Sequence, residues 1–385
     1  MNGVTQLLIY PAVNAQLGSE KYGEMLFIMS IINTAATAIG SSCNGARFRD
    51  SAEGRTNNRP YNIIMLAGSV LICVVILFFN LLGITLLEAA ELSLVLLLSV
   101  ATTWRYYLDA DHKLRLDFKS GFIFYLFISV GYLIGIPLLR ATGQWAFALL
   151  IGEAACFIPI LYSGILLRKD KEPVSGEFRT ALRYVLALSG GNLLSQLIFN
   201  GDRFLLKLLI NGEAVTTFYI ASLFGKTMSF ITVPLSGVII GYLVKYKGEL
   251  SLKVTNIVTA ISVVFVALAT AACTLASHII LPFLYPDDFA AASTYFVIGN
   301  MALILFFIGS LILSSVLLRY ANMRYQFTIN VIYAVLFCAL CIPLTILQGV
   351  AGFAIGILIT NGIRFIGVFA LCYKVALSHK SSEER

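Results

Sequence analysis

The stretch NIIMLAGSVLICVVILFFNLLGI, residues 62–84, contains no ionised side chain, and runs of this kind decide the class of the protein. An apolar run of about 18 residues or more is long enough to span a bilayer as an α-helix. Similar runs recur along the whole chain, which is 59% hydrophobic and 12% charged, with a mean hydropathy of +0.88. A soluble protein carries about 25% charged residues. The sequence therefore predicts an all-α polytopic membrane protein.

The apolar runs predict about twelve transmembrane helices. Their expected bounds are 3–17, 23–43, 62–84, 89–108, 120–139, 144–167, 181–210, 214–243, 254–277, 291–318, 325–347 and 350–373. The basic loop RKDKEPVSGEFRT, residues 168–180, is the best boundary between an N-terminal lobe (1–172) and a C-terminal lobe (173–385). The first span is short beside its counterpart at 181–210, so we expect it to be truncated, with about ten or more residues missing ahead of it.

Most of the basic residues lie on one side of the membrane in this predicted topology. Twenty-one of the 27 Lys and Arg residues fall in alternate loops and the C-terminal tail, including Arg47 after the second span and Arg105 after the fourth. The opposite side has only Lys21 and Arg140. Positive loops face the cytoplasm, which predicts that both termini are cytoplasmic. The pI near 9.0 is thus a topology signal and argues against a nucleic-acid partner.

The two halves resemble each other at corresponding places. AQLGSEKYGEMLFIMSI (15–31) is similar to LLINGEAVTTFYIASLF (208–224), and WAFALLIGEAACFIPI (145–160) to AGFAIGILITNGIRFI (351–366). An offset of six spans keeps the direction of each helix, which predicts two six-helix lobes related by a parallel pseudo-two-fold axis.

Several stretches also resemble a known family. YPAVNAQLGSEKYGEMLFI, FNGDRFLLKLLINGEAVTTFYIASLF, FLYPDDFAAASTYFVI and LQGVAGFAIGILITNGI are similar to turns and span ends of bacterial polysaccharide (O-antigen-type) flippases. These belong to the multidrug/oligosaccharidyl-lipid/polysaccharide exporter (MATE-like) superfamily. The resemblance implies a two-lobed transporter that moves an undecaprenyl-pyrophosphate-linked oligosaccharide, an O-antigen, capsule or exopolysaccharide unit, across the cytoplasmic membrane by alternating access.

Four cations remain inside predicted spans: Arg203, Lys207, Lys226 and Arg364. Against them stand two acids, Asp202 and Glu153, so the spans carry a positive surplus. An ionised group at the bilayer centre costs about 2.5–3.5 kcal/mol on insertion scales and must face protein or water. A surplus of cations suits a cavity that accepts a pyrophosphate. We therefore expect Arg203, Lys226 and Arg364 to converge on one water-filled cavity between the lobes.

Other residues near this cluster have weaker roles. Lys207, close to a helix end, either joins the cavity or extends its ammonium to the outer interface. Asn200 and Gln196 share a helix with Arg203, and either bond sugar hydroxyls or bond neighbouring helices. Asp202 and Glu153 are candidate sites for a coupling H⁺ or Na⁺, because burial raises the pKa of a carboxyl. A nearby Arg would instead hold either acid ionised.

The sequence supports no cofactor and no metal. Cys338 and Cys341 form a CxxC, but in mid-membrane without His or acidic neighbours they are interpreted as packing residues. Three other functions stay open: a cation-coupled multidrug antiporter, whose cavity should be acidic or apolar, a membrane-embedded glycan polymerase or ligase, which should carry a large outer loop, and a scaffold for the polysaccharide-assembly machinery. The predicted protein is a transporter and not an enzyme.

Overall fold

The computed structural model of the chain describes residues 2–52, 57–85, 87–114, 116–162, 177–245, 250–320 and 323–383. Within these ranges every regular element is a helix, and there is no strand. Seven of the described helices are long and apolar enough to cross a membrane. The predicted all-α polytopic class is therefore confirmed. The chain forms two compact units, Met1–Phe204 and Leu205–Arg385.

The helices of the first unit are α1 (Asn2–Val4), η1 (Thr5–Ile9), α2 (Tyr10–Leu17), α3 (Ser19–Ala36), η2 (Thr37–Ser41), α4 (Ser42–Ala52), α5 (Arg59–Leu81), α6 (Ala89–Leu114), α7 (Phe118–Thr142), α8 (Trp145–Ala154), α9 (Phe157–Tyr162) and α10 (Glu177–Phe199). The helix α11 (Gly201–Leu209) crosses from this unit into the second. The π-helical segment η2 joins α3 and α4 into one candidate span, Ser19–Ser51.

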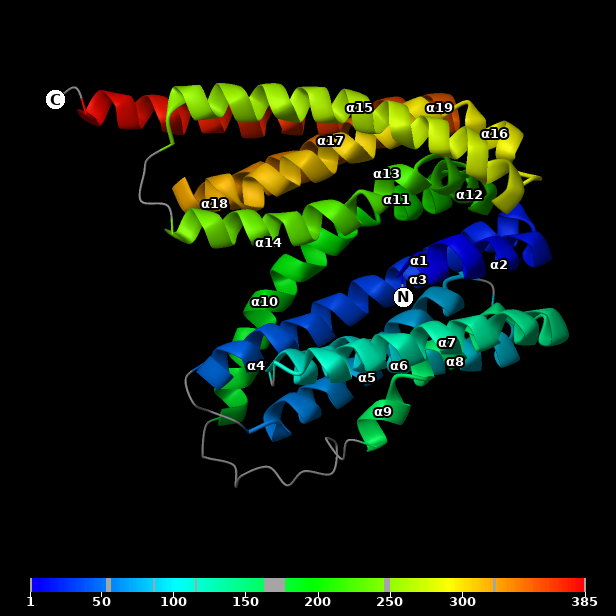
Figure 1. Cartoon of the computed structure of the whole chain (residues 1–385). Helices are drawn as coiled ribbons and strands as arrows, with labels where there is room; N and C mark the ends of the chain where they lie inside the picture. The colour runs from blue at the N-terminus through cyan, green and yellow to red at the C-terminus, as the bar shows by residue number, and fades with distance from the viewer. Residues whose placement is uncertain are drawn as a thin grey trace. The chain divides into compact units, whose positions relative to one another are not determined.

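The helices of the second unit are α12 (Gly212–Ala221), α13 (Leu223–Thr227), α14 (Ser229–Lys245), α15 (Leu252–Leu284), α16 (Phe289–Ser293), α17 (Phe296–Ser314), α18 (Val316–Tyr320) and α19 (Met323–Glu383). The buried helix α17 packs against both α15 and α19, which run alongside it in Figure 1. The core of this unit gathers where these three helices meet.

The twelve predicted spans coincide with helical segments, although 62–84 runs three residues past the end of α5 at Leu81, and residues 163–167 of the span 144–167 lie outside the described residues. The last two share α19, which is two helices meeting at Gly349, where φ is 59° and ψ is −137°. A positive φ is a conformation that glycine adopts without the steric penalty of a Cβ atom, so the chain reverses there.

Each of the stretches that begin at Trp145 and Ala351 follows a glycine with a positive φ. Gly143, with φ 71°, precedes α8, and Gly349 precedes the second half of α19. In each case the glycine stands two residues ahead of the matched stretch, at Trp145 and at Ala351. A positive-φ glycine at matching positions supports the internal repeat, whose pseudo-two-fold axis stays a prediction.

The boundary between the units differs from the one expected near residue 172, a position outside the described residues. The helix α10 packs on α3, η2, α4 and α5, and it buries Ala181 and Val185. The hydroxyl of Ser189 donates to the carbonyl of Ala38 in η2 (2.6 Å), and Asn192 donates to Ser42 Oγ (2.8 Å). These contacts place α10 in the first unit.

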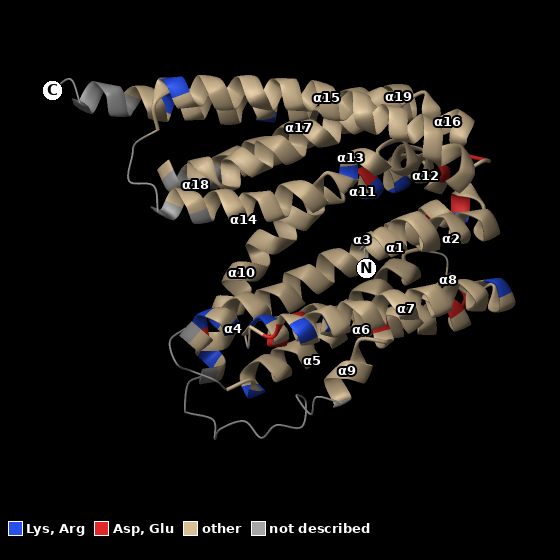
Figure 2. Cartoon of the chain, viewed as in Figure 1, with Lys and Arg blue, Asp and Glu red and all other residues tan. Residues whose placement is uncertain are grey.

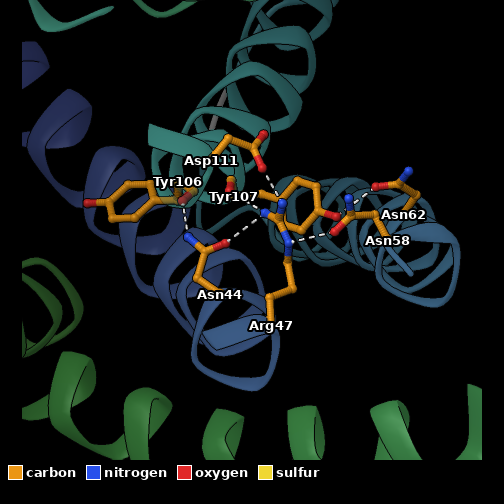
Figure 3. Close-up of polar contacts among 7 residues, drawn as sticks. All are labelled: Asn44, Arg47, Asn58, Asn62, Tyr106, Tyr107 and Asp111. Carbon is orange, nitrogen blue, oxygen red and sulfur yellow. Dashed lines mark hydrogen bonds and ion pairs between the residues drawn. The ribbon is translucent and has the colours of Figure 1, made fainter. Parts of the chain in front are cut away.

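Two cations expected in cytoplasmic loops are buried in helices, and that expectation was wrong for them. Arg47 lies in α4 and forms an ion pair with Asp111 of α6. Its Nε donates to Asn58 Oδ1 (3.1 Å) and its Nη1 to the carbonyl of Tyr107 (3.3 Å), while the Tyr107 hydroxyl donates to Asn62 (2.7 Å; Figure 3). The helices reach further than the hydropathy runs, because paired charges can be buried.

The second cation whose predicted position was wrong is Arg105. It lies in the interior of α6 with 6% of its surface exposed. Charges of both signs appear around α4, α5 and α6 in Figure 2. The middles of most described helices are free of charge, as a membrane-spanning segment requires.

The helices α7 and α8 lie side by side at small residues (Figure 1). Gly131 and Gly135 of α7 form a GxxxG pair, and a Cβ at Gly135 would meet the carbonyl of Ala148 at 2.5 Å. Across the same contact, a Cβ at Gly152 would lie 2.0 Å from the ring of Tyr132. Small residues let membrane helices approach closely, and here they bring the backbones of α7 and α8 together.

We expect Gly152→Ala to destabilise the first unit by about 1–3 kcal/mol, the usual cost of overpacking. Thermal unfolding in detergent measures this change. The matched control is Gly237→Ala in α14, where no atom lies within 4 Å of the added Cβ. An unfolding temperature for Gly152→Ala equal to that of the control would contradict this packing.

Candidate functional site

The buried charges of the membrane helices divide unequally between the two units. Leaving histidine aside, the described helices of the first unit bury Arg47, Arg105, Asp111, Glu153, Asp202 and Arg203. Cations and acids are equal in number in this set. The described helices of the second unit bury Lys226 and Arg364 and no carboxylate, since its buried acid, Asp288, lies in the turn before α16. The positive surplus expected from the sequence therefore belongs to the second unit.

Glu153 of α8 is held by two partners. Arg105 forms an ion pair with it through Nε, and the hydroxyl of Tyr132 donates to Oε1 at 2.6 Å. Glu153 is 1% exposed, and the guanidinium of Arg105 lies 4.4 Å from the ring centroid of Tyr106. This cluster joins α6, α7 and α8 and neutralises a carboxylate proposed as a coupling-ion site.

Arg203 belongs to a polar face where α10 and α11 meet α3. Its Nη1 donates to Ser30 Oγ (3.0 Å), and one turn away Asn200 donates to Thr34 Oγ1 (3.4 Å) and to Gln196 Oε1 (3.3 Å). The structure thus brings three predicted site residues, Arg203, Asn200 and Gln196, together in the first unit. Their hydrogen bonds to α3 are those of ordinary helix association.

The other two predicted residues of α11 differ in burial. Asp202 is buried, beside Arg203 in the chain. Lys207 falls in the second unit and is half-buried. A half-buried Lys near a helix end can extend its ammonium toward water.

Lys226 lies beside a break in its span. The helix ends at Ala221, and after Ser222 the short α13 begins. The break leaves the N–H of Gly225 without a helical acceptor, and Asn300 of α17 accepts it through Oδ1 (2.7 Å). Asn300 also donates to Ser277 of α15 (3.2 Å). This fully buried amide therefore fixes the backbone next to Lys226, which is itself buried.

Arg364 of α19 contacts the same helix, α17. Its Nη1 donates to the carbonyl of Phe306 and to Ser310 Oγ, both at 3.0 Å. Its guanidinium carbon lies 4.6 Å from the ring centroid of Phe306 and 5.3 Å from that of Tyr333, a cation–π arrangement. Arg364 forms no ion pair with any described residue.

The helix α17 therefore organises the surroundings of both cations of the second unit. Asn300 acts next to Lys226, and Phe306 contacts Arg364, six residues further on. Six helical residues correspond to about 9 Å along the axis. The expected convergence of these two cations with Arg203 stays a prediction.

The sequence reasoning missed several residues of this site. Arg105 lay within the predicted fourth span but was interpreted as a loop residue. Asn300 and Asn361 are isolated amides in apolar helices, a signal of buried hydrogen bonding that could have identified them. Ser310, Phe306 and Tyr333 carry no signal of their own. The packing of α17 on α19 brings the first two to Arg364, and the reversal of α19 at Gly349 brings Tyr333 there.

Comparisons with solved structures show the fold. The chain is similar to an inward-facing multidrug resistance MATE family transporter of the MOP superfamily, with a TM-score of 0.72 and 14% identity over 98% of this chain and 96% of that one. It is also similar to the lipid II flippase MurJ in an inward closed conformation, with a TM-score of 0.70 and 16% identity over 98% and 88% of the two chains. The bent form of the Vibrio cholerae MATE transporter VcmN gives a TM-score of 0.62 and 16% identity over 97% and 93%.

No protein-family model matches the sequence, and no curated protein does. At these identities the likeness is one of fold. The chain has the architecture shared by MATE transporters and MurJ.

We expect Glu153→Gln and Arg105→Gln each to lower the free energy of unfolding by about 3–5 kcal/mol, because each leaves a buried charge without its partner. Combining Arg105→Gln with Glu153→Gln in one variant should cost much less than the sum of the two single changes. Thermal unfolding of the two single variants and of the double variant measures these changes in the free energy of unfolding. Additive effects would show that the two side chains act independently.

Proposed function

We propose that this protein is a flippase that moves a lipid-linked oligosaccharide with a pyrophosphate head group across the bacterial inner membrane. The observation that carries the proposal is Arg364, a buried guanidinium in a membrane helix with no carboxylate partner among the described residues. Lys226 adds a second buried cation in the same unit. The resemblance of the sequence to polysaccharide flippases supplies the substrate class.

The physical argument concerns charge compensation. Taking an ion out of water costs several kcal/mol, and a carbonyl, a hydroxyl and two rings around Arg364 compensate this only in part. A bound anion would compensate the rest of this desolvation cost, and a phosphate matches the planar donor set of Arg. In a purely structural position a buried Arg gives no advantage in stability, because an apolar side chain of the same size packs as well.

A cation-coupled multidrug antiporter is the second candidate, and the shared fold with MATE transporters favours it. Its cations would need buried carboxylates. Two of those in the first unit, Glu153 and Asp111, are ion-paired with Arg105 and Arg47. These pairs argue against cation binding there, so we place the flippase first.

We expect Arg364→Ala to slow translocation by about tenfold or more, since a charge-assisted bidentate hydrogen bond is worth about that factor or more. The assay follows a fluorescent polyprenyl-pyrophosphate oligosaccharide between the leaflets of proteoliposomes, with a quencher added outside. Arg140→Ala is the matched control, because Arg140 is an exposed Arg at the end of α7.

Wild-type translocation by Arg364→Ala would remove the observation on which the proposal rests. Gradient-driven uptake of a cationic dye, with no movement of the pyrophosphate probe, would establish the antiporter instead. A wild-type protein that inserts normally but moves neither probe would leave the assembly scaffold as the better interpretation.

A further inference from the structure

Only part of the Arg364 guanidinium is used within the second unit. A guanidinium has five N–H donors in one plane. Nη1 uses both of its own, on the Phe306 carbonyl and on Ser310 Oγ. Neither Nε nor Nη2 makes a hydrogen bond to any described residue, and Nε is fully buried. The unused donors thus form one edge of the plane, the Nε/Nη2 edge.

This edge is held in a fixed orientation. The two hydrogen bonds of Nη1 set the plane of the guanidinium, and the rings of Phe306 and Tyr333 lie against it. Two parallel N–H donors on one edge match two oxygens of a single phosphate group. A preorganised edge of this kind loses little side-chain entropy when an oxyanion binds.

Asn361 provides an unused acceptor one turn away. It precedes Arg364 by three residues on α19, a spacing that puts the two side chains on the same helix face. Its Nδ2 donates to the carbonyl of Ala302 (2.7 Å), one turn of α17 before Phe306. Its Oδ1 is buried and has no hydrogen-bond partner in the described chain.

An unpaired buried donor and an unpaired buried acceptor each lower the stability of the folded protein, because neither regains the hydrogen bond that it made to water. Here the two belong to neighbouring residues that contact one face of α17. Their chemistry is complementary to a ligand that carries an anion and, close to it, an N–H or O–H donor. A sugar attached to a phosphate has this arrangement, because its hydroxyl or amide substituents lie next to the glycosidic oxygen.

We propose that Arg364 and Asn361 form a two-part site for a glycosyl phosphate. The Nε/Nη2 edge of Arg364 binds the phosphate, and Oδ1 of Asn361 accepts a hydrogen bond from the first sugar. The site rests on the proposed function, and it adds that the protein reads the sugar next to the pyrophosphate as well as the charge. Asn361 is then a specificity-determining residue and Ser310 a positioning residue for Arg364.

The test measures binding of two fluorescent probes to the purified full-length protein in lipid nanodiscs. One probe is a short-chain polyprenyl pyrophosphate, and the other is the same lipid pyrophosphate carrying one hexose. Arg364→Lys should weaken the binding of both probes by about tenfold or more, because Lys keeps the charge and loses the bidentate edge. Asn361→Leu should weaken only the hexose probe, by about tenfold.

Thr360→Ala is the matched control. Thr360 is equally buried and adjacent to Asn361, but its hydroxyl donates to the carbonyl of Gly356 in its own helix. We expect both probes to bind this variant as they bind the wild type. Thermal unfolding of each variant shows that it is folded.

Asn361→Asp keeps the test decisive if Asn361→Leu does not fold, because Asn361 also bonds α17. The aspartate places a negative charge beside Arg364, so it should weaken both probes. Wild-type affinity of Arg364→Lys and Asn361→Asp for both probes would overturn this site while leaving the proposed function intact. A folded wild-type protein that binds neither probe would overturn both.

Discussion

An ionised side chain in a membrane-embedded helix must be compensated, and this requirement organises both halves of the protein. In the first unit the compensation is internal: Arg47 pairs with Asp111, and Arg105 pairs with Glu153. Each pair joins helices that are distant in sequence, so charge and packing specify the same arrangement. Removing one member of such a pair leaves a buried charge, which is why these pairs act as structural elements.

In the second unit neutral groups, and no described buried acid of its helices, surround the buried cations. Its buried cations lie beside α17, a helix with no charged residue. The amide of Asn300 bonds the backbone next to Lys226, and the carbonyl of Phe306 and the hydroxyl of Ser310 accept hydrogen bonds from Arg364. Neutral dipoles and aromatic rings orient a guanidinium without cancelling its charge. The result is a fixed positive group in a unit whose described helices bury no acid, which is the electrostatic condition for holding an anion.

The fold alone does not separate the two candidate functions, because a multidrug transporter and a lipid flippase share it. The distinction depends on individual side chains. Glu153 is a buried acid that is ion-paired with Arg105, which suits a structural role. Arg364 has an unused donor edge, which suits anion recognition. The break in the helix next to Lys226 is another such local feature. It leaves the backbone N–H of Gly225 without a helical acceptor, and Oδ1 of Asn300 accepts its hydrogen bond.

The sequence by itself determined the membrane class and the positions of the spans, because bilayer thickness sets the length of apolar chain that each spanning helix needs. It also identified Arg364 and Lys226 as cations within spans. Only the tertiary structure decided which charges are compensated. Arg105 meets Glu153 across 48 residues, and α10 joins the first unit through Ser189 and Asn192. Pairing depends on which helix faces meet, and apolar helices of similar composition carry too little information in their sequences to specify that.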